Sequence, residues 1–418
     1  VPWYKVPLSI SAVSGPSQGT CLVTTSVPAG VLFGLYDLEV AVMVGSTNFT
    51  LAEQHSVYVY NASALTQLNF AQFSDPHVIY PDQEVAFNVA PPNQAPIIQN
   101  VSYNGYFEKL FAETSITRPT FIIVTGDIAN AGQEQEFQEM RAILQTSSVP
   151  VLTLLGNHDH RSPPSFNYYL APSYYARSIG PWRIIILDSG ASEGNGLFGE
   201  QLTWYEHELQ LAQAARQQIL VFMHIPSAPE PTDGWLIAGN AEFRALNLKY
   251  GVRAIFAGHH HDFEATFANG TTLNTYDPVP VAAGPIYVIT GSPTIADNTN
   301  DFNYYGWRWV TSFSNGDIAM GYDLNGTGQA YSIYGMPRNG LNQTDGTLSM
   351  SVTNNYNKPF YNVTLPETFD LGNTRDHLYP SIGTVVTQVW GPTNSTVFVR
   401  FDLPANTTES ITFTRSPN

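Results

Sequence analysis

Aspartate, asparagine and histidine recur at places where an apolar run of the sequence ends. In the stretch 151–160, VLTLLGNHDH, the run stops at Gly156 and is followed by Asn157 and His158. An amide oxygen can ligate a metal, and an imidazole can give a proton to a leaving group. Taken alone, so short a motif equally fits a buried strand that ends in a polar turn. Four further runs end in the same way: FSDPH (73–77), FIIVTGD (121–127), ILVFMH (219–224) and AIFAGHHHD (254–262).

The apolar runs in front of these polar residues predict buried strands. A short apolar run bounded by turn residues is typical of a strand inside a sheet. Ligand sites of open α/β sheets lie beyond the carboxyl ends of the strands. The sequence therefore predicts that the polar side chains meet in one site. Imidazole suits zinc and iron, and carboxylate and amide oxygens also suit manganese.

Amphipathic helices alternate with these strands, which predicts a layered α/β domain. Apolar residues recur on one helix face in three segments: Phe137, Met140 and Leu144; Leu202, Tyr205 and Leu209; and Phe243, Leu246 and Tyr250. Gly251 follows the third segment as an expected C-cap. The stretch 163–181, rich in proline and tyrosine, is expected to be a long loop beside the site.

β-rich segments flank the region of alternating strands and helices. In residues 1–70, alternating apolar positions such as Leu38 and Val40 are typical of half-buried strands. Residues 341–418 contain several short runs of the same kind. We therefore expect a β-rich N-terminal segment, a catalytic domain at 71–340 and a sandwich-like C-terminal domain. The two terminal segments could equally share one β module.

The composition restricts the class of partner. The 418 residues have a net charge of −17, which argues against nucleic acid, because its binders present a basic footprint. No run approaches the ~20 apolar residues of a transmembrane helix. Cys21 is the single cysteine, so no disulfide can form within the chain.

Asn-x-Ser/Thr sequons, the acceptors of N-glycans, occur along the whole chain. The nine sequon asparagines are Asn48, Asn61, Asn100, Asn269, Asn325, Asn342, Asn362, Asn394 and Asn406. With the acidic, lysine-poor composition, they predict a secreted glycoprotein that is extracellular or endolysosomal. The chain begins at Val1 rather than Met, as expected if a signal peptide has been removed.

The five polar strand ends, in this order, resemble the motifs of the calcineurin-like metallophosphoesterases. That family has the pattern DxH, GDxx, GNH(D/E), H and GHxH, and the match runs from Asp75 to His261. Within it, the chain is most similar to the acid sphingomyelinase-like phosphodiesterases. The resemblance implies a layered β-sandwich flanked by helices. It also implies a hydrolase of small phosphodiesters or phosphomonoesters.

The resemblance further implies two divalent transition-metal ions, of which zinc fits best and iron or manganese are alternatives. Asp127 would bridge the ions. The remaining ligands would be Asp75, His77 and His261 for the first ion, and Asn157, His224 and His259 for the second. His259 and His261 are two residues apart, so on an extended segment they would point the same way. Metal-bound hydroxide would attack the phosphorus, with the two ions stabilising the charge.

His158 is the candidate general acid, and Asp159 is expected to orient its ring. His160 and His260 are candidate substrate-binding residues. Purple acid phosphatases have a tyrosine ligand to ferric iron three residues after the GD aspartate. Asn130 stands here instead, which favours a divalent pair. A glycosylated surface or binding protein with a vestigial phosphoesterase fold is the alternative, and the intact set of seven ligands argues against it.

Overall fold

A computed structural model of the chain describes most of its 418 residues. The described residues are 5–15, 23–61, 65–88, 98–105, 107–108, 111, 119–190, 196–262, 264–273, 279–293, 307–320, 338–342, 348–354, 360–404 and 407–417. Cys21 and the sequons at Asn325 and Asn406 lie outside them. The chain divides into two compact units, Val1–Ala64 and Leu65–Asn418. The boundaries expected at residues 70 and 340 stay predictions.

The first unit contains two antiparallel strand pairs. β1 (Ser9–Val13) pairs with β2 (Val23–Ser26), and β3 (Gly34–Val44) pairs with β4 (Thr47–Val59). The strand predicted around Leu38 is confirmed. Its apolar side chains are more exposed than predicted, since Val42 is 43% and Phe49 of the opposite strand 51% exposed. A two-stranded ribbon has no second layer of its own under which to bury them.

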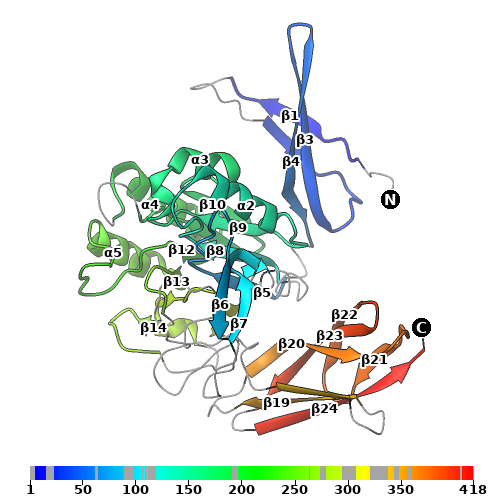
Figure 1. Cartoon of the computed structure of the whole chain (residues 1–418). Coiled ribbons are helices and arrows are strands. Elements are labelled where there is room, and N and C mark those ends of the chain that lie inside the picture. Colours follow the sequence, from blue (N-terminus) through cyan, green and yellow to red (C-terminus); the bar gives the residue numbers. More distant parts are fainter. Residues whose placement is uncertain are drawn as a thin grey trace. The chain divides into compact units, whose positions relative to one another are not determined.

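Two sheets form the layered core of the second unit (Figure 1). One has the order β17-β16-β5-β8-β9, with β5, β8 and β9 parallel. Its strands are β5 (Gln67–Phe73), β8 (Phe121–Thr125), β9 (Val151–Leu154), β16 (Arg308–Phe313) and β17 (Ile318–Met320). The other has the order β10-β11-β12-β13-β15-β14, with the four central strands parallel. Its strands are β10 (Tyr175–Ile179), β11 (Trp182–Ile186), β12 (Gln218–Phe222), β13 (Ala254–Ala257), β14 (Glu264–Phe267) and β15 (Ile286–Ile289). β6 (Glu84–Asn88) and β7 (Ile98–Ser102) form a separate hairpin.

Aromatic side chains fill the space between the two sheets. Phe70 of β5 packs edge-on against Phe222 of β12 and Phe256 of β13, with ring centroids 5.4 and 5.2 Å apart. All three side chains are fully buried, and burying each stabilises the fold by about 1.5–3 kcal/mol. Trp182 of β11 also donates a 2.9 Å hydrogen bond to Ser312 of β16. The two sheets therefore face each other as a sandwich.

Helices cover the outer faces of this sandwich. Their bounds are Glu134–Leu144 (α2), Pro163–Tyr169 (α3), Gly199–Ala214 (α4) and Asn240–Tyr250 (α5), with 3-10 turns at Asp159–Arg161 (η2) and Val281–Ala283 (η3). Alternate residues of the six-stranded sheet, such as Ile185 and Val221, join Leu209 of α4 and Phe243 of α5 in one buried cluster. The predicted α/β fold, a sandwich flanked by helices, is confirmed. Among the described residues, no helix is long and apolar enough to cross a membrane.

The stretch 163–181 is not the long loop that its prolines and tyrosines suggested. Pro163 is the first residue of α3, a position where the missing N–H group of proline costs no helical hydrogen bond. Strand β10 then pairs antiparallel with β11. Tyr175 of β10 is buried, and its hydroxyl donates to the carbonyl of Thr153 over 2.9 Å. This segment therefore forms an edge of the six-stranded sheet.

The C-terminal segment consists of antiparallel strands, as predicted. One sheet has the order β18-β19-β24-β21 and the other β20-β23-β22. The strands are β18 (Arg338–Asn342), β19 (Leu348–Asn354), β20 (Phe360–Asp370), β21 (His377–Pro380), β22 (Thr384–Trp390), β23 (Asn394–Leu403) and β24 (Thr407–Ser416). Val397, Val399 and Phe401 occupy alternate positions of β23 and are buried, as expected for a strand face on a core, and Phe398 on the other face is buried as well.

Candidate metal centre

The carboxyl ends of five strands carry the seven predicted ligands. These ligands are Asp75 and His77 after β5, Asp127 after β8, Asn157 after β9, His224 after β12, and His259 and His261 after β13. Five of them have positive φ: Asp75 (54°), His77 (46°), Asp127 (46°), His259 (71°) and His261 (52°). A positive φ costs a residue other than glycine about 1–3 kcal/mol, and residues strained in this way cluster at functional sites. His259 and His261 therefore do not lie on an extended segment, contrary to the prediction.

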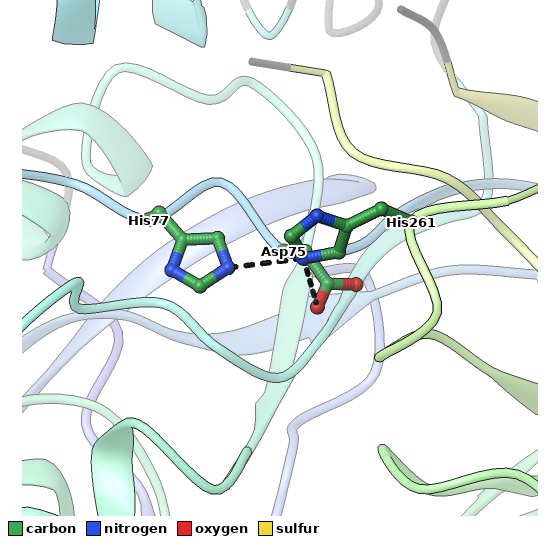
Figure 2. A group of neighbouring side chains, drawn as sticks. All are labelled: Asp75, His77 and His261. Carbon is green, nitrogen blue, oxygen red and sulfur yellow. Dashed lines mark hydrogen bonds and ion pairs between the residues drawn. The ribbon is translucent and has the colours of Figure 1, made fainter. Parts of the chain in front are cut away.

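Asp75, His77 and His261 form the first group of ligands, and Figure 2 shows their side chains meeting. The Nε2 atoms of His77 and His261 are 3.2 Å apart, and the Nε2 of His261 is 3.3 Å from Asp75 Oδ1. Asp75 is fully buried and His77 is 3% exposed. Burial lowers the pKa of His77 to about 4, so its ring is neutral, the form that ligates metals. Two ring nitrogens and a carboxylate oxygen that converge in this way fit a divalent transition-metal ion.

Asp127, His224 and His259 form the second group, which Asn157 joins. The Nε2 of His224 is 3.3 Å from Asp127 Oδ2 and 3.1 Å from Asn157 Oδ1. The same Asp127 oxygen is 3.8 Å from Nε2 of His77, in the first group. Asp127 therefore lies between the two groups, where a bridging ligand would have to lie.

The buried charges of the site favour a cation. Burial alone would lower the pKa of His224, but Asp127 and Asp75 outweigh it and raise that pKa to about 10. Burial likewise raises the pKa of Asp127, and the charge on His224 more than reverses this, so the carboxyl is ionised. Metal ions would supply the same positive charge while leaving the His224 ring neutral. Burial lowers the pKa of His259 to about 4, which also keeps that ring neutral.

Backbone groups orient these ligands. Nδ1 of His224 donates to the carbonyl of Thr125 over 2.8 Å, which turns Nε2 toward the other ligands. The backbone N–H of His259 donates to the Asp75 carboxylate over 3.0 Å. Gly156 is required by close approach, because an added Cβ would lie 2.1 Å from the backbone nitrogen of Asp127. The site thus depends on tight contacts between loops that follow different strands.

The His158 ring lies beside the first group of ligands. Its centroid is 4.7 Å from that of His77, and one of its ring nitrogens lies within 4.8 Å of ligand atoms of His77 and Asp127. Nδ1 of His158 is 2.5 Å from the carbonyl of Asn130. Since a carbonyl only accepts, Nδ1 carries the hydrogen, and Nε2 is the ring atom left for proton exchange.

Asp159 does not orient the His158 ring as predicted. Its fully buried carboxylate accepts hydrogen bonds from the backbone N–H groups of Gly156 (2.8 Å), Ala129 (2.9 Å) and Ile128 (3.1 Å). The side chains of His158 and Asp159 point in different directions although the residues are adjacent. The hydrogen bond that was expected between the His158 ring and Asp159 is made instead to the carbonyl of Asn130. Burial and the neighbouring charge of Asp127 raise the pKa of Asp159 to about 7. Asp159 thus ties the loop after β8 to the turn after β9.

The two candidate substrate-binding histidines lie outside the groups of ligands. Nε2 of His160 is 2.6 Å from Asp188 Oδ1, and Nε2 of His260 is 3.0 Å from the carbonyl of Gly234. His260 also packs edge-on against Trp235, with centroids 4.4 Å apart. Their role in binding substrate stays a prediction. Asp188 was missed, although it follows the apolar run of β11 and so shows the strand-end pattern that identified the other residues.

Residues 68–263 match the family model described as calcineurin-like phosphoesterase. This region is a calcineurin-like phosphoesterase domain. Among curated relatives, a glycerophosphodiester phosphodiesterase of Enterobacter lignolyticus is 30% identical over 183 residues, which cover 38% of this chain and 62% of that protein. A serine/threonine-protein phosphatase of Danio rerio is 28% identical over 168 residues, covering 34% of this chain and 54% of that protein.

A dimetal phosphatase of Danio rerio is a similar solved structure. It is 18% identical, covers 63% of this chain and 96% of its own length, and superposes with a TM-score of 0.42. The chain spans a little over three fifths of the length of the curated glycerophosphodiester phosphodiesterase and about half of the length of the curated protein phosphatase. The predicted proximity to the acid sphingomyelinase-like branch stays a prediction.

Proposed function

We propose that the chain is a dinuclear-metal hydrolase of phosphodiesters, phosphomonoesters or both. The position of Asp127, between two groups of ligands that come from five strand ends, supports this most directly. The relatives are named as a phosphodiesterase and a protein phosphatase, so both ester classes occur among them.

In this proposal, Asp75, His77 and His261 would hold one metal ion, and Asn157, His224 and His259 would hold the other. Asp127 lies between them as the shared ligand. When bound, divalent ions would supply positive charge against the phosphate and lower the pKa of water. Four imidazoles among the seven ligands favour zinc over harder cations such as magnesium. Asn130 is not a phenolate donor, which disfavours a ferric centre.

In this proposal, His158 and Asp159 have different roles. His158 gives the proton on Nε2 to the leaving oxygen while Nδ1 stays bound to Asn130. Asp159 keeps the loops that carry Asp127 and Asn157 together through its three backbone hydrogen bonds. No nucleophilic side chain is needed, because phosphoryl transfer depends on positioning and charge stabilisation.

We also propose that the protein is secreted and N-glycosylated. Four of the described sequon asparagines, Asn48, Asn61, Asn269 and Asn394, are exposed at the surface. A bulky N-glycan fits the folded protein only at the surface, so the exposure supports the proposal. The acidic composition is consistent with an extracellular or endolysosomal protein.

The test is turnover of bis(4-nitrophenyl) phosphate and 4-nitrophenyl phosphate by the zinc-loaded and manganese-loaded chain. We expect hydrolysis of at least one ester, and its loss in Asp127→Asn. Asp402→Asn, at an exposed position of β23, is the matched control and should retain activity. If the wild type turns over neither ester with either metal, the alternative of a binding protein with a vestigial site takes precedence.

A further inference from the structure

Arg161 places a positive charge beside the His158 ring. Its Nη1 donates to the carbonyl of Asn130 over 3.0 Å, and the same carbonyl accepts the hydrogen bond of His158 Nδ1 over 2.5 Å. Arg161 is exposed, and in the described part of the chain no ion pair includes it. Acidic side chains outnumber basic ones by 34 to 17, so an arginine beside the metal centre that has no carboxylate partner among the described residues is informative.

The backbone of Arg161 is held by the loop that leads into α2. A Cβ added at Gly132, whose φ is 71°, would lie 2.7 Å from the Cβ of Arg161 and 2.9 Å from the carbonyl oxygen of His158. The loop therefore packs directly against the η2 turn. Together with the hydrogen bond to Asn130, this contact fixes where the guanidinium lies relative to His158.

We propose that Arg161 determines substrate specificity by binding a second anionic group, on the leaving alcohol of the phosphate ester. This rests on the proposed function, in which His158 protonates the leaving oxygen. The leaving alcohol then lies on the His158 side of the phosphorus, and Arg161 is the cation beside His158. The metal ions would neutralise the negative charge of the reacting phosphate. Arg161 is therefore available to bind a second negative group of the substrate.

The guanidinium has the donors for this role. It offers five N–H groups, and the structure gives one of them to Asn130. The remaining donors form a planar fork that matches a carboxylate or a phosphate, whereas lysine offers a single point charge. The substrate class is therefore a phosphate ester of an alcohol that carries a carboxylate or a second phosphate.

Two matched pairs of esters test the proposal. In the first, 4-carboxyphenyl phosphate is compared with the nearly isosteric 4-carbamoylphenyl phosphate. In the second, hydroquinone bisphosphate is compared with hydroquinone monophosphate. Each compound is assayed both as the phosphate monoester and as its methyl phosphodiester. The proteins compared are wild type, Arg161→Gln and Arg161→Lys. The control is Arg177→Gln, which changes an exposed arginine of β10.

We expect wild type and Arg177→Gln to show about tenfold higher kcat/KM for the anionic member of at least one pair. In Arg161→Gln that ratio should fall to about one, and Arg161→Lys should fall between. The pair that responds distinguishes a carboxylate from a phosphate. A ratio that stays at the wild-type value in Arg161→Gln overturns the proposal, because Arg161 then acts only through Asn130 and His158. So does a wild-type ratio of about one in both pairs.

Calorimetry keeps the proposal falsifiable if the wild type hydrolyses nothing, which is the failure of the proposed function itself. The probes are 4-carboxybenzylphosphonate and 4-carbamoylbenzylphosphonate, titrated into the zinc-loaded wild type and Arg161→Gln. Tighter binding of the carboxylate by wild type, lost in Arg161→Gln, would support the anion site independently of turnover. Equal affinities of the wild type for both phosphonates would overturn it.

Discussion

Replacing Asp159 with alanine tests whether two ligand loops depend on one buried carboxylate. The change removes the acceptor of three backbone N–H groups, those of Gly156, Ala129 and Ile128, and all three residues are buried. A buried donor left without a partner costs about 1–3 kcal/mol. The three donors share one acceptor and so are not additive. We therefore expect the free energy of unfolding to fall by about 3–5 kcal/mol, a large part of the ~5–15 kcal/mol of a typical protein.

The same change should weaken metal binding, because Asp159 ties the loop of Asp127 to the turn of Asn157. Losing a group that positions metal ligands typically costs about 10–100-fold in affinity. Unfolding in urea followed by circular dichroism measures the first effect. Competition with a chelator of known affinity, in the absence of urea, measures the change in metal affinity.

Glu136→Ala is the matched control for this experiment. Glu136 is 2% exposed, and its carboxylate accepts backbone N–H groups of Ala131 (3.0 Å) and Gln133 (2.9 Å) at the start of α2. It should also destabilise the protein but retain metal. The reasoning is refuted if Asp159→Ala unfolds like wild type, or if Glu136→Ala loses metal to the same degree.

Three further predictions concern the proton donor, the core and the glycans. His158→Asn should lower turnover by ~10²–10⁴-fold with metal retained, and should lower it more for an alkyl ester than for a nitrophenyl ester. Equal losses on both esters, or loss of metal, would contradict the role of His158. Phe70→Ala should lower the free energy of unfolding by about 3–5 kcal/mol, because the ring is fully buried between the two sheets. A change below about 1 kcal/mol in urea unfolding would show that the sheets do not pack through this side chain. Treating protein from its native host with an N-glycan-removing enzyme should lower its apparent mass, and an unchanged mass would count against secretion through a eukaryotic pathway.

Much of the layered core and the set of candidate ligands could be predicted because both depend on local patterns. An apolar run that ends in Asp, Asn or His shows a buried strand and the polar residue at its end in one short stretch. The parallel order of β5, β8 and β9 brings three of these ends to one edge of their sheet, and the parallel pair β12 and β13 brings the other two to one edge of the second sheet. The same pattern was present at Asp188, so that omission was not a limit of the sequence.

The features that the sequence did not predict depend on direction or on distant pairing. His158 and Asp159 are neighbours in the chain, but the η2 turn points one toward the ligands and the other into the backbone of two loops. Strand β10 is an exception, because it pairs with the adjacent β11 across the two residues Gly180 and Pro181, a turn signal that the sequence did contain. Arg161 follows His158 by three residues in the η2 turn, but both side chains turn to the same carbonyl, that of Asn130, which precedes Arg161 by 31 residues in the sequence.

The metal content of the purified chain tests the central claim most directly. Elemental analysis of protein that has not been exposed to chelators should find close to two transition-metal ions per chain, mainly zinc. Asp127→Asn should lower that number, because Asp127 lies between both groups of ligands. A wild-type chain with no bound metal, in which neither zinc nor manganese restores hydrolysis of any phosphate ester, would contradict the account.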